Sequence, residues 1–254
     1  MQARPGRKFR ATYISAITQL SPHLLRFVLV GDDLHDFPSD QDGVHVKAVL
    51  SPDGQPFTDD GWREATKRSY TIREFNPTTK QLVLDFVVNR HQGPATDWAQ
   101  QAKVGDYLGI AGPGEAKMTD FNGSHYLLVG DLTSVNAVNG FARYMRPDAQ
   151  VIGVVSVPTR ADCIAMDAGS HLHMHWHIED ETSQSLPDLV ESLAANMPRD
   201  TQVFLGLEAS QLRAIKSMLL NELEFERLNI HATGYWKKGL DADRFGEDKR
   251  RNPL

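Results

Sequence analysis

The pattern of apolar and polar residues changes once along the chain, and this change constrains the fold more than any other feature. From Phe9 to about Gly114, short alternating runs of apolar and polar residues are separated by turn residues. Runs of this kind are typical of antiparallel strands, and Asn76–Thr79 predicts a hairpin between the fourth and fifth runs. We therefore expect a closed antiparallel β-barrel. Its predicted strands are Ala11–Leu20, His23–Val30, Val44–Leu50, Arg68–Phe75, Gln81–Asn89 and Val104–Ile110, with a short helix at Pro94–Ala102.

After Phe121 the pattern becomes an alternation of strands and helices, which predicts a parallel sheet covered by helices. The predicted strands are His125–Val129, Gln150–Val157, His171–Ile178, Gln202–Leu207 and Ile230–Trp236, and the predicted helices are Ser134–Tyr144, Ser185–Ala195 and Gln211–Leu223. The residue pattern changes near Lys117–Ser124, so we expect a β-domain over residues 1–120 and an α/β domain over residues 121–254. We expect the charged tail after Gly239 to be mobile, with a short terminal helix as the alternative.

Composition excludes several classes of protein. A net charge of −6 argues against general nucleic-acid binding, which usually needs a basic surface. One cysteine, Cys163, excludes an internal disulfide and a cysteine-ligated iron–sulfur cluster within one chain. The N-terminus lacks the apolar core of a signal peptide, and no run approaches the length of a membrane helix. We expect a cytoplasmic protein that binds neither nucleic acid nor membrane.

Two segments carry the chemistry. The run Arg68–Arg73 reads RSYTIR, and on a strand Arg68 and Tyr70 share one face while Ser69 and Thr71 share the other. A tyrosine ring can lie against an isoalloxazine, a hydroxyl can hydrogen-bond its edge, and an arginine can pair with a diphosphate.

The second segment, Gly93–Ala99, reads GPATDWA and begins a helix with proline in its first turn. The free backbone N–H groups and the positive dipole end of such a helix suit a pyrophosphate. Gly93 lets the backbone approach the phosphates, and Thr96 adds a hydroxyl donor. The two segments together predict a flavin site.

RSYTIR resembles the R-x-Y-[ST] flavin signature of the ferredoxin–NADP reductase superfamily. The longer pattern, with LDFVVNRHQGPATDWAQQAKVGDYLGIAGP, HYLLVGD and the late GYWKKG, resembles the siderophore-interacting proteins over about Phe9–Gly239. Members of that family are FAD-containing ferric-siderophore reductases. The resemblance implies an N-terminal FAD-binding β-barrel followed by an NAD(P)-binding-like α/β domain, as in ferredoxin reductases.

The resemblance implies a role for each matching position. Arg68 is assigned to the diphosphate, Tyr70 to the ring face and Thr71 to the ring edge near N5. The full set of cofactor-binding residues is Arg68, Ser69, Tyr70, Thr71, Asp85, Val87, Asn89, His91, Gly93, Pro94, Ala95, Thr96, Asp131 and Thr133. Relatives commonly carry a histidine at the position of Asn89, and here His91 follows two residues later. Trp98 is either a cofactor contact or a core contact of its helix.

The family's electron donor meets the second domain at a turn that here begins Gly130-Asp131-Leu132-Thr133. The family's G-E-A signature corresponds to Leu207-Glu208-Ala209, which keeps the acid but not the glycine. A bulky Leu207 is expected to crowd a nicotinamide approaching from that side. The donor is therefore left as NAD(P)H or reduced ferredoxin.

Ferric siderophores are often anionic, so a small basic pocket is expected. Lys47, Lys237 and Lys238 match positions where the family carries basic residues that face substrate, and Arg143 is a fourth candidate. The predicted function is FAD-dependent reduction of a ferric siderophore with release of Fe(II). A general NAD(P)H-flavin oxidoreductase and a non-catalytic siderophore-binding flavoprotein remain as alternatives.

His171, His173, His175 and His177 alternate along one predicted strand. Four imidazoles on one face can bind a metal, but residues two apart on a strand lie about 7 Å from each other. We favour a polar outer face of an edge strand and assign no metal centre. No nucleophile elbow, P-loop or HExxH motif is present in the sequence.

Overall fold

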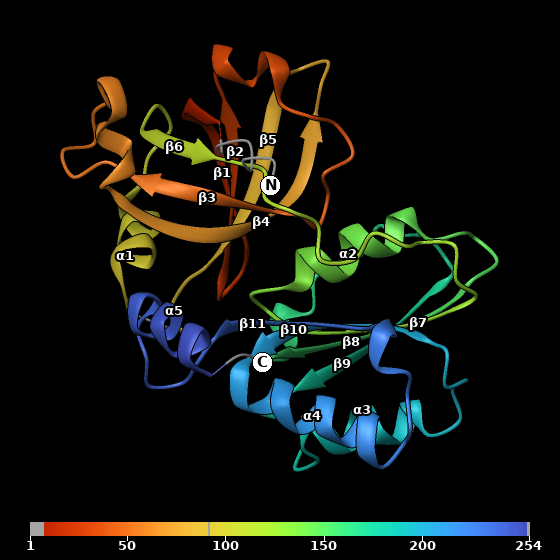
Figure 1. Ribbon diagram of the computed structural model, residues 1–254. Helices are drawn as coiled ribbons and strands as arrows, with labels where there is room; N and C mark the ends of the chain where they lie inside the picture. Colours follow the sequence, from red (N-terminus) through yellow and green to blue (C-terminus); the bar gives the residue numbers. More distant parts are fainter. Residues whose placement is uncertain (1–7, 91, 253–254) are drawn as a thin grey trace. The chain divides into compact units, whose positions relative to one another are not determined.

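The computed structural model describes residues 8–90 and 92–252 (Figure 1). The chain divides into two compact units, and the boundary along the sequence lies between Ala116 and Lys117. Within the described residues, none of the helices combines the length and the apolar composition needed to cross a membrane.

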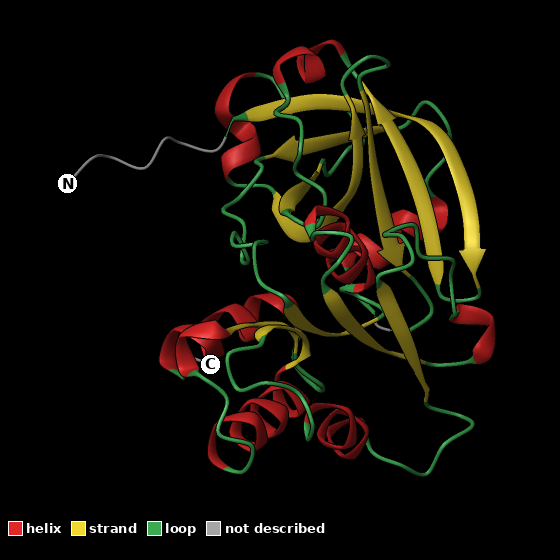
Figure 2. Cartoon of the chain, turned by 90° about the vertical axis from the view of Figure 1, so that its right-hand side faces the viewer, coloured by secondary structure: helices red, strands yellow, loops and turns green. Residues whose placement is uncertain are grey.

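The first unit is a closed six-stranded antiparallel barrel, as predicted, and Figure 2 shows its strands in yellow. The strands are β1 (Phe9–Ser21), β2 (Leu24–Val30), β3 (His45–Leu50), β4 (Thr66–Asn76), β5 (Gln81–Val87) and β6 (Tyr107–Ala111). They follow one another around the barrel in the order β1-β2-β5-β4-β3-β6, and pairing of β6 with β1 closes it. The predicted hairpin joins β4 and β5. Short 3₁₀ helices, η1 (Asp32–Asp36) and η2 (Asp59–Arg63), and one α-helix, α1 (Pro94–Gln101), lie between strands.

Alternate residues of the strands fill the barrel. Val46, Ala48 and Leu50 of β3 are buried in the same apolar cluster as Leu82 and Leu84 of β5. Because successive side chains on a strand point to opposite faces, the residues between them lie outside this core. The period-two pattern of the sequence therefore separates the barrel core from its outer face.

Two predicted strand ends were wrong because backbone turns interrupt them. The last strand begins at Tyr107 rather than Val104, because Gly105 has a φ of +94° and the Asp106 amide bonds to the Lys103 carbonyl. The fifth strand ends at Val87 rather than Asn89, where φ is +59°. Asparagine is one of the few residues that adopt this left-handed conformation readily.

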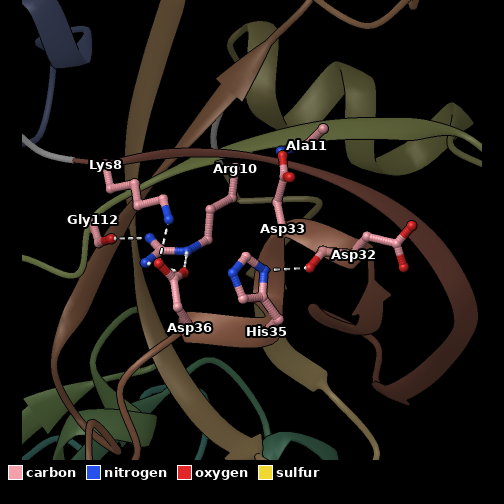
Figure 3. Close-up of polar contacts among 8 residues, drawn as sticks. All are labelled: Lys8, Arg10, Ala11, Asp32, Asp33, His35, Asp36 and Gly112. Carbon is pink, nitrogen blue, oxygen red and sulfur yellow. Dashed lines mark hydrogen bonds and ion pairs between the residues drawn. The ribbon is translucent and has the colours of Figure 1, made fainter.

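A buried arginine ties the end of the barrel together (Figure 3). The Arg10 side chain is 4% exposed; its Nη1 donates to the Gly112 carbonyl at 2.7 Å, and its Nη2 pairs with Asp36 at 3.1 Å. Lys8 binds the same carboxylate, and its hydrogen bond is the main cause of the lowered pKa of Asp36. The Ala11 amide donates to Asp33. These contacts hold η1 and the chain leaving β6 against β1.

The second unit is a five-stranded parallel sheet in the order β11-β10-β7-β8-β9, as predicted for an α/β domain. Its strands are β7 (His125–Asp131), β8 (Gln150–Val157), β9 (Leu172–Ile178), β10 (Gln202–Glu208) and β11 (Ile230–Trp236). Its helices are α2 (Val135–Tyr144), α3 (Leu186–Ala194), α4 (Ala209–Asn221), α5 (Ala242–Arg251) and the short 3₁₀ turns η3 (Arg160–Asp162) and η4 (Arg227–Asn229). Figure 1 shows α2 on one face of the sheet and α3 and α4 on the other.

The charged tail forms α5, which packs against β11. Phe245 is buried, and Lys249 Nζ donates to the Gly234 carbonyl of β11 at 2.7 Å. Lys237, one residue past β11, pairs with Asp248 of α5 at 2.9 Å. The expectation of a mobile tail was wrong, because these contacts make the tail a folded part of the second unit.

Candidate functional site

The strands β4 and β5 part from each other partway along the barrel. Their ladder runs from Asn76 and Gln81 to Ile72 and Leu84. Beyond it, Arg68–Thr71 pairs with β3 and Asp85–Val87 pairs with β2. We call these two stretches the β4–β5 split. The split brings the RSYT motif of one strand opposite the end of the strand that leads to the GPAT helix.

Two stacked aromatic rings bridge the split. The rings of Tyr70 and Phe86 have centroids 3.7 Å apart and planes inclined by 23°. Phe86 is completely buried and lies 4.9 Å from Phe27 and 5.6 Å from Trp98, centroid to centroid. Trp98 is partly buried and packs against this core, as the core-contact interpretation predicts, and its contact with a cofactor stays a prediction. Burial raises the pKa of Tyr70, so its hydroxyl stays protonated at neutral pH. Tyr70 thus presents a flat, uncharged ring on a rigid support.

The opposite face of β4 carries polar groups. Ser69 lies opposite Lys47 of β3, and Lys47 Nζ donates to Ser69 Oγ at 2.7 Å. Thr71 is buried and lies opposite His45. Arg68 is half-buried and shares the Tyr70 face, and its Nη1 donates to the Lys67 carbonyl at 2.9 Å. The structure therefore places the predicted substrate lysine Lys47 beside a predicted cofactor residue.

The helix α1 begins with its first turn open. Its N-cap is Gly93, which supplies no capping side chain, and the first helical hydrogen bond runs from the Asp97 amide to the Gly93 carbonyl. The amides of Ala95 and Thr96 precede that bond, so they point out of the helix end. Gly93 has a φ of +154°, and no described atom lies within 4 Å of the position a Cβ would take. This backbone fits a phosphate group that approaches closely.

Other predicted cofactor residues have protein partners. Asp85 accepts two hydrogen bonds of 2.8 Å from Arg26, which form a bidentate pair. Asn89 donates to the Pro22 carbonyl and accepts from Gln100. Val87 is half-buried at the end of β5. His91 lies outside the described residues. An open hollow of about 650 Å³ lies beside α1, lined by Asn89, Arg90, Gln92, Asp97 and Gln100.

In the second unit, the Asp131 carboxylate joins three strands. It accepts from the Thr133 amide at 2.9 Å, the Trp236 Nε1 at 2.8 Å and the Glu208 amide at 3.1 Å. Burial raises the pKa of Asp131, and the hydrogen bonds from Thr133 and Trp236 oppose that rise. The turn after β7 is further tied by Ser134 Oγ, which donates to the Gly206 carbonyl. The carboxylate thus fixes the carboxyl edge of the sheet.

Two family models match consecutive parts of the chain. The siderophore-interacting FAD-binding domain matches residues 13–117, and the siderophore-interacting protein model matches residues 123–239. The chain belongs to the siderophore-interacting proteins. The first match covers the barrel with its split, and the second covers the parallel sheet but stops before α5.

Individual relatives of this siderophore-interacting protein agree with the family. The ferric vibriobactin reductase ViuB of Vibrio cholerae is 28% identical over 244 residues, which cover 91% of this chain and 90% of the relative. The crystal structure of SipS from Aeromonas hydrophila superposes with a TM-score of 0.82 at 28% identity, over 97% of this chain and 98% of that chain. A ferredoxin reductase in carbazole 1,9a-dioxygenase shares the fold, with a TM-score of 0.67 at 17% identity, over 90% of this chain and 70% of that chain.

One expectation about the donor side of this siderophore-interacting protein was wrong. Leu207 is completely buried and packs with Leu127, Val129 and Leu205 on the sheet face covered by α3 and α4. Its side chain therefore cannot crowd a nicotinamide at the carboxyl edge. Glu208, the next residue, points to that edge and caps α4 by accepting from the Ser210 and Gln211 amides.

The predicted basic residues of the second unit differ in their surroundings. Lys237 is paired with Asp248, whereas Lys238 is exposed and its backbone amide donates to Glu208. Arg143 is exposed in the last turn of α2. The substrate-binding role of these residues and of Lys47 stays a prediction, as do the cofactor roles.

The histidine strand is an edge strand, as favoured, but its imidazoles do not all face solvent. His177 is buried; its Nε2 donates to the Gln184 carbonyl at 2.8 Å and its Nδ1 lies 3.0 Å from Ser156 Oγ. His171 precedes the strand and lies 2.9 Å from the Ala142 carbonyl. Among residues 8–90 and 92–252, no group of three or more His, Cys, Asp and Glu side chains is arranged to hold a metal ion.

Sequence reasoning missed several residues that support the site. Phe86 supports Tyr70, Arg26 pairs with Asp85, and Trp236 binds Asp131. Of these three residues, only Phe86 could have been recognised from the sequence nearby, because it continues the alternation of buried residues set by Leu82 and Leu84 along β5.

Proposed function

We propose that this siderophore-interacting protein is an FAD-dependent ferric-siderophore reductase that releases iron as Fe(II) in the cytoplasm. Its electrons come from NAD(P)H or reduced ferredoxin. The observation that carries this proposal is the β4–β5 split, which presents an arginine, a supported tyrosine ring and hydroxyls beside the strand that leads to an open helix N-terminus. The name of the Vibrio cholerae relative, a ferric vibriobactin reductase, supports the same reaction.

The residues of the split fit FAD. In the proposal, Tyr70 packs against the flavin ring, Ser69 and Thr71 hydrogen-bond its edge, and Arg68 pairs with the diphosphate. The amides of Ala95 and Thr96 at the start of α1, next to Gly93 and Pro94, bind the same diphosphate. Bound FAD accepts two electrons together and passes them on singly, as an Fe(III) acceptor requires. Asp85, Val87, Asn89 and His91 complete the proposed cofactor site.

The second unit is proposed to meet the electron donor at the carboxyl edge of its sheet, where open parallel sheets bind ligands. Asp131 and Thr133 shape the turn there, because the carboxylate holds the Thr133 amide and the ends of β10 and β11. Because the Leu207 side chain is buried in the core, it gives no reason to prefer reduced ferredoxin over NAD(P)H as the electron donor.

Photoreduced protein, mixed anaerobically with a ferric tris-catecholate complex, is expected to regain its oxidised-flavin absorbance. One reduced flavin supplies two electrons, so two Fe(II) ions should form per flavin and be trapped by a ferrous chelator. Stopped-flow absorbance measures the rate of reoxidation.

The gallium(III) complex of the same ligand is the matched control, because it has the charge and shape of the ferric complex but accepts no electron. Binding of the gallium complex without reoxidation by the ferric one would make the protein a siderophore-binding flavoprotein. Equal rates with ferric complexes and free quinones would instead indicate a general flavin oxidoreductase. A purified protein that is colourless and takes up no added FAD would refute the proposal.

Replacing Lys47 and Lys238 together with glutamine is expected to raise the KM for an anionic ferric siderophore by about tenfold, which corresponds to about 1.4 kcal/mol. Each substitution removes one positive charge that is proposed to attract the anion, and FAD content should stay unchanged. Steady-state kinetics and flavin absorbance measure the two quantities. The exposed lysines Lys80 and Lys103 offer a control double variant with the same change in net charge. An equal rise of KM in both double variants would refute the substrate-binding role proposed for Lys47 and Lys238.

A further inference from the structure

One carboxylate in the second unit does two things at once. Glu208 is 6% exposed and ends β10. Its Oε2 caps α4, accepting from the Ser210 amide at 2.7 Å and the Gln211 amide at 3.0 Å. Its Oε1 accepts from the Lys238 amide at 3.2 Å. Capping needs only one side-chain oxygen, and serine or aspartate is the usual choice. The longer glutamate adds the reach to the chain that follows β11.

The hydrogen bonds between β10 and β11 do not by themselves fix the position of the backbone at Lys238. Leu207 pairs with Gly234, but Glu208 pairs with Trp236, so β11 has one extra residue here. Such a bulge disrupts the regular ladder locally. Beyond Trp236 the strand ends. Side chains of neighbouring strands replace the ladder at this point.

A second carboxylate fixes the same segment. Asp131 Oδ2 accepts both from the Glu208 amide and from Trp236 Nε1. β7, β10 and β11 lie next to one another in the sheet (Figure 1), so the two acids link three strand ends. Trp236 is held through its ring and Lys238 through its amide. The backbone between them therefore has little freedom to move.

The two lysines of this segment are not equivalent. The Lys237 ammonium is paired with Asp248, and the Lys238 side chain is exposed. Lys238 is the better placed of the two to meet an anion from solvent. The position of the Lys238 ammonium relative to such an anion depends on the position of the Lys238 backbone.

We propose that Glu208 is a positioning residue for Lys238: it holds the Lys238 backbone amide so that the ammonium meets an anionic ferric siderophore. Asp131 assists through Trp236. This inference rests on the proposed function, because Lys238 is assigned to the substrate there. Glu208 itself does not contact the substrate.

The test replaces Glu208 with serine, which still caps α4 but is too short to reach the Lys238 amide. Hydrogen exchange at the Lys238 amide should become faster, while exchange along α4 stays unchanged. The Kd for a gallium(III) tris-catecholate should rise about fivefold, a factor that corresponds to about 1 kcal/mol. FAD content should stay within twofold. Simple Coulomb attraction predicts the opposite sign, because removing a carboxylate favours an anion.

A double-mutant cycle with Lys238→Gln decides whether the effect passes through Lys238. The double variant should bind the gallium complex no more weakly than Lys238→Gln alone. Multiplying effects would overturn the inference, and so would a Glu208→Ser variant with unchanged Lys238 exchange and unchanged Kd.

The same measurements distinguish failure of the proposed function from failure of the inference about Glu208. If the wild-type protein binds no gallium complex, Lys238 has no substrate role, and the inference that Glu208 positions it for the substrate is overturned. The exchange measurement would still report whether Glu208 holds the amide. Gallium is redox-inert, so the binding arm does not depend on turnover.

Discussion

Replacing Arg68 with alanine is expected to weaken FAD binding by about a hundredfold. A charge-assisted hydrogen bond to a phosphate contributes about 1.5–3 kcal/mol, and each 1.4 kcal/mol is a factor of ten. Arg68 lies on the Tyr70 face of β4, beside the strand that leads to the open end of α1. Fluorescence titration of apoprotein with FAD gives the Kd.

Arg63 supplies the control for the Arg68 variant. Arg63 is exposed, and it forms an ion pair with Asp60, which is exposed as well. Arg63→Ala removes the same charge and should leave the Kd for FAD within about twofold. Arg68→Lys keeps the charge but loses the planar fork that binds two oxygens, so it should fall between wild type and Arg68→Ala. An Arg68→Ala protein with wild-type affinity would remove the diphosphate assignment.

Replacing Phe86 with alanine is expected to lower the free energy of unfolding of the barrel by about 3–5 kcal/mol. Phe86 is completely buried between Phe27, Trp98 and Tyr70. Its loss leaves a cavity and removes the ring on which Tyr70 rests. FAD binding should weaken as well, because Tyr70 then has to be ordered when the cofactor binds. Denaturant unfolding of the apoprotein and FAD titration measure the two effects.

Phe204 separates the two effects of Phe86. It is also completely buried, but in the second unit against Phe141. Phe204→Ala should destabilise its own unit by a similar amount and leave the Kd for FAD unchanged. Phe86→Leu is the milder variant if Phe86→Ala does not fold. Equal losses of FAD affinity in the Phe86 and Phe204 variants would mean that Phe86 has no specific part in the site.

Much of the fold follows from local patterns. Alternation predicts the barrel strands because each strand has one buried and one outer face, and the strand–helix alternation predicts the parallel sheet. The same pattern already contained the answer for Leu207. Val203, Leu205 and Leu207 are two apart along β10 and share its core face, so Leu207 belonged with them. The period of two along β10 therefore places Leu207 in the core and not at the surface.

The parts that could not be predicted depend on register and on distant partners. The motif residues were identified, but the point where β4 and β5 part depends on which residues pair across three strands. The Arg26–Asp85 pair joins residues 59 apart, and the Arg10–Gly112 bond joins residues 102 apart. The pairing of Lys237 with Asp248 required a folded α5. Local sequence carries no signal for such contacts.

The two sides of the β4–β5 split are held by different neighbours, one by β3 and the other by β2. The backbone of each side is therefore fixed by pairing within the barrel, and the stacked rings of Tyr70 and Phe86 join the two sides. A receptor built in advance loses little conformational entropy on association. At the proposed FAD site, more of the contact energy would then appear as affinity, and the cofactor would bind without rearrangement of these strands.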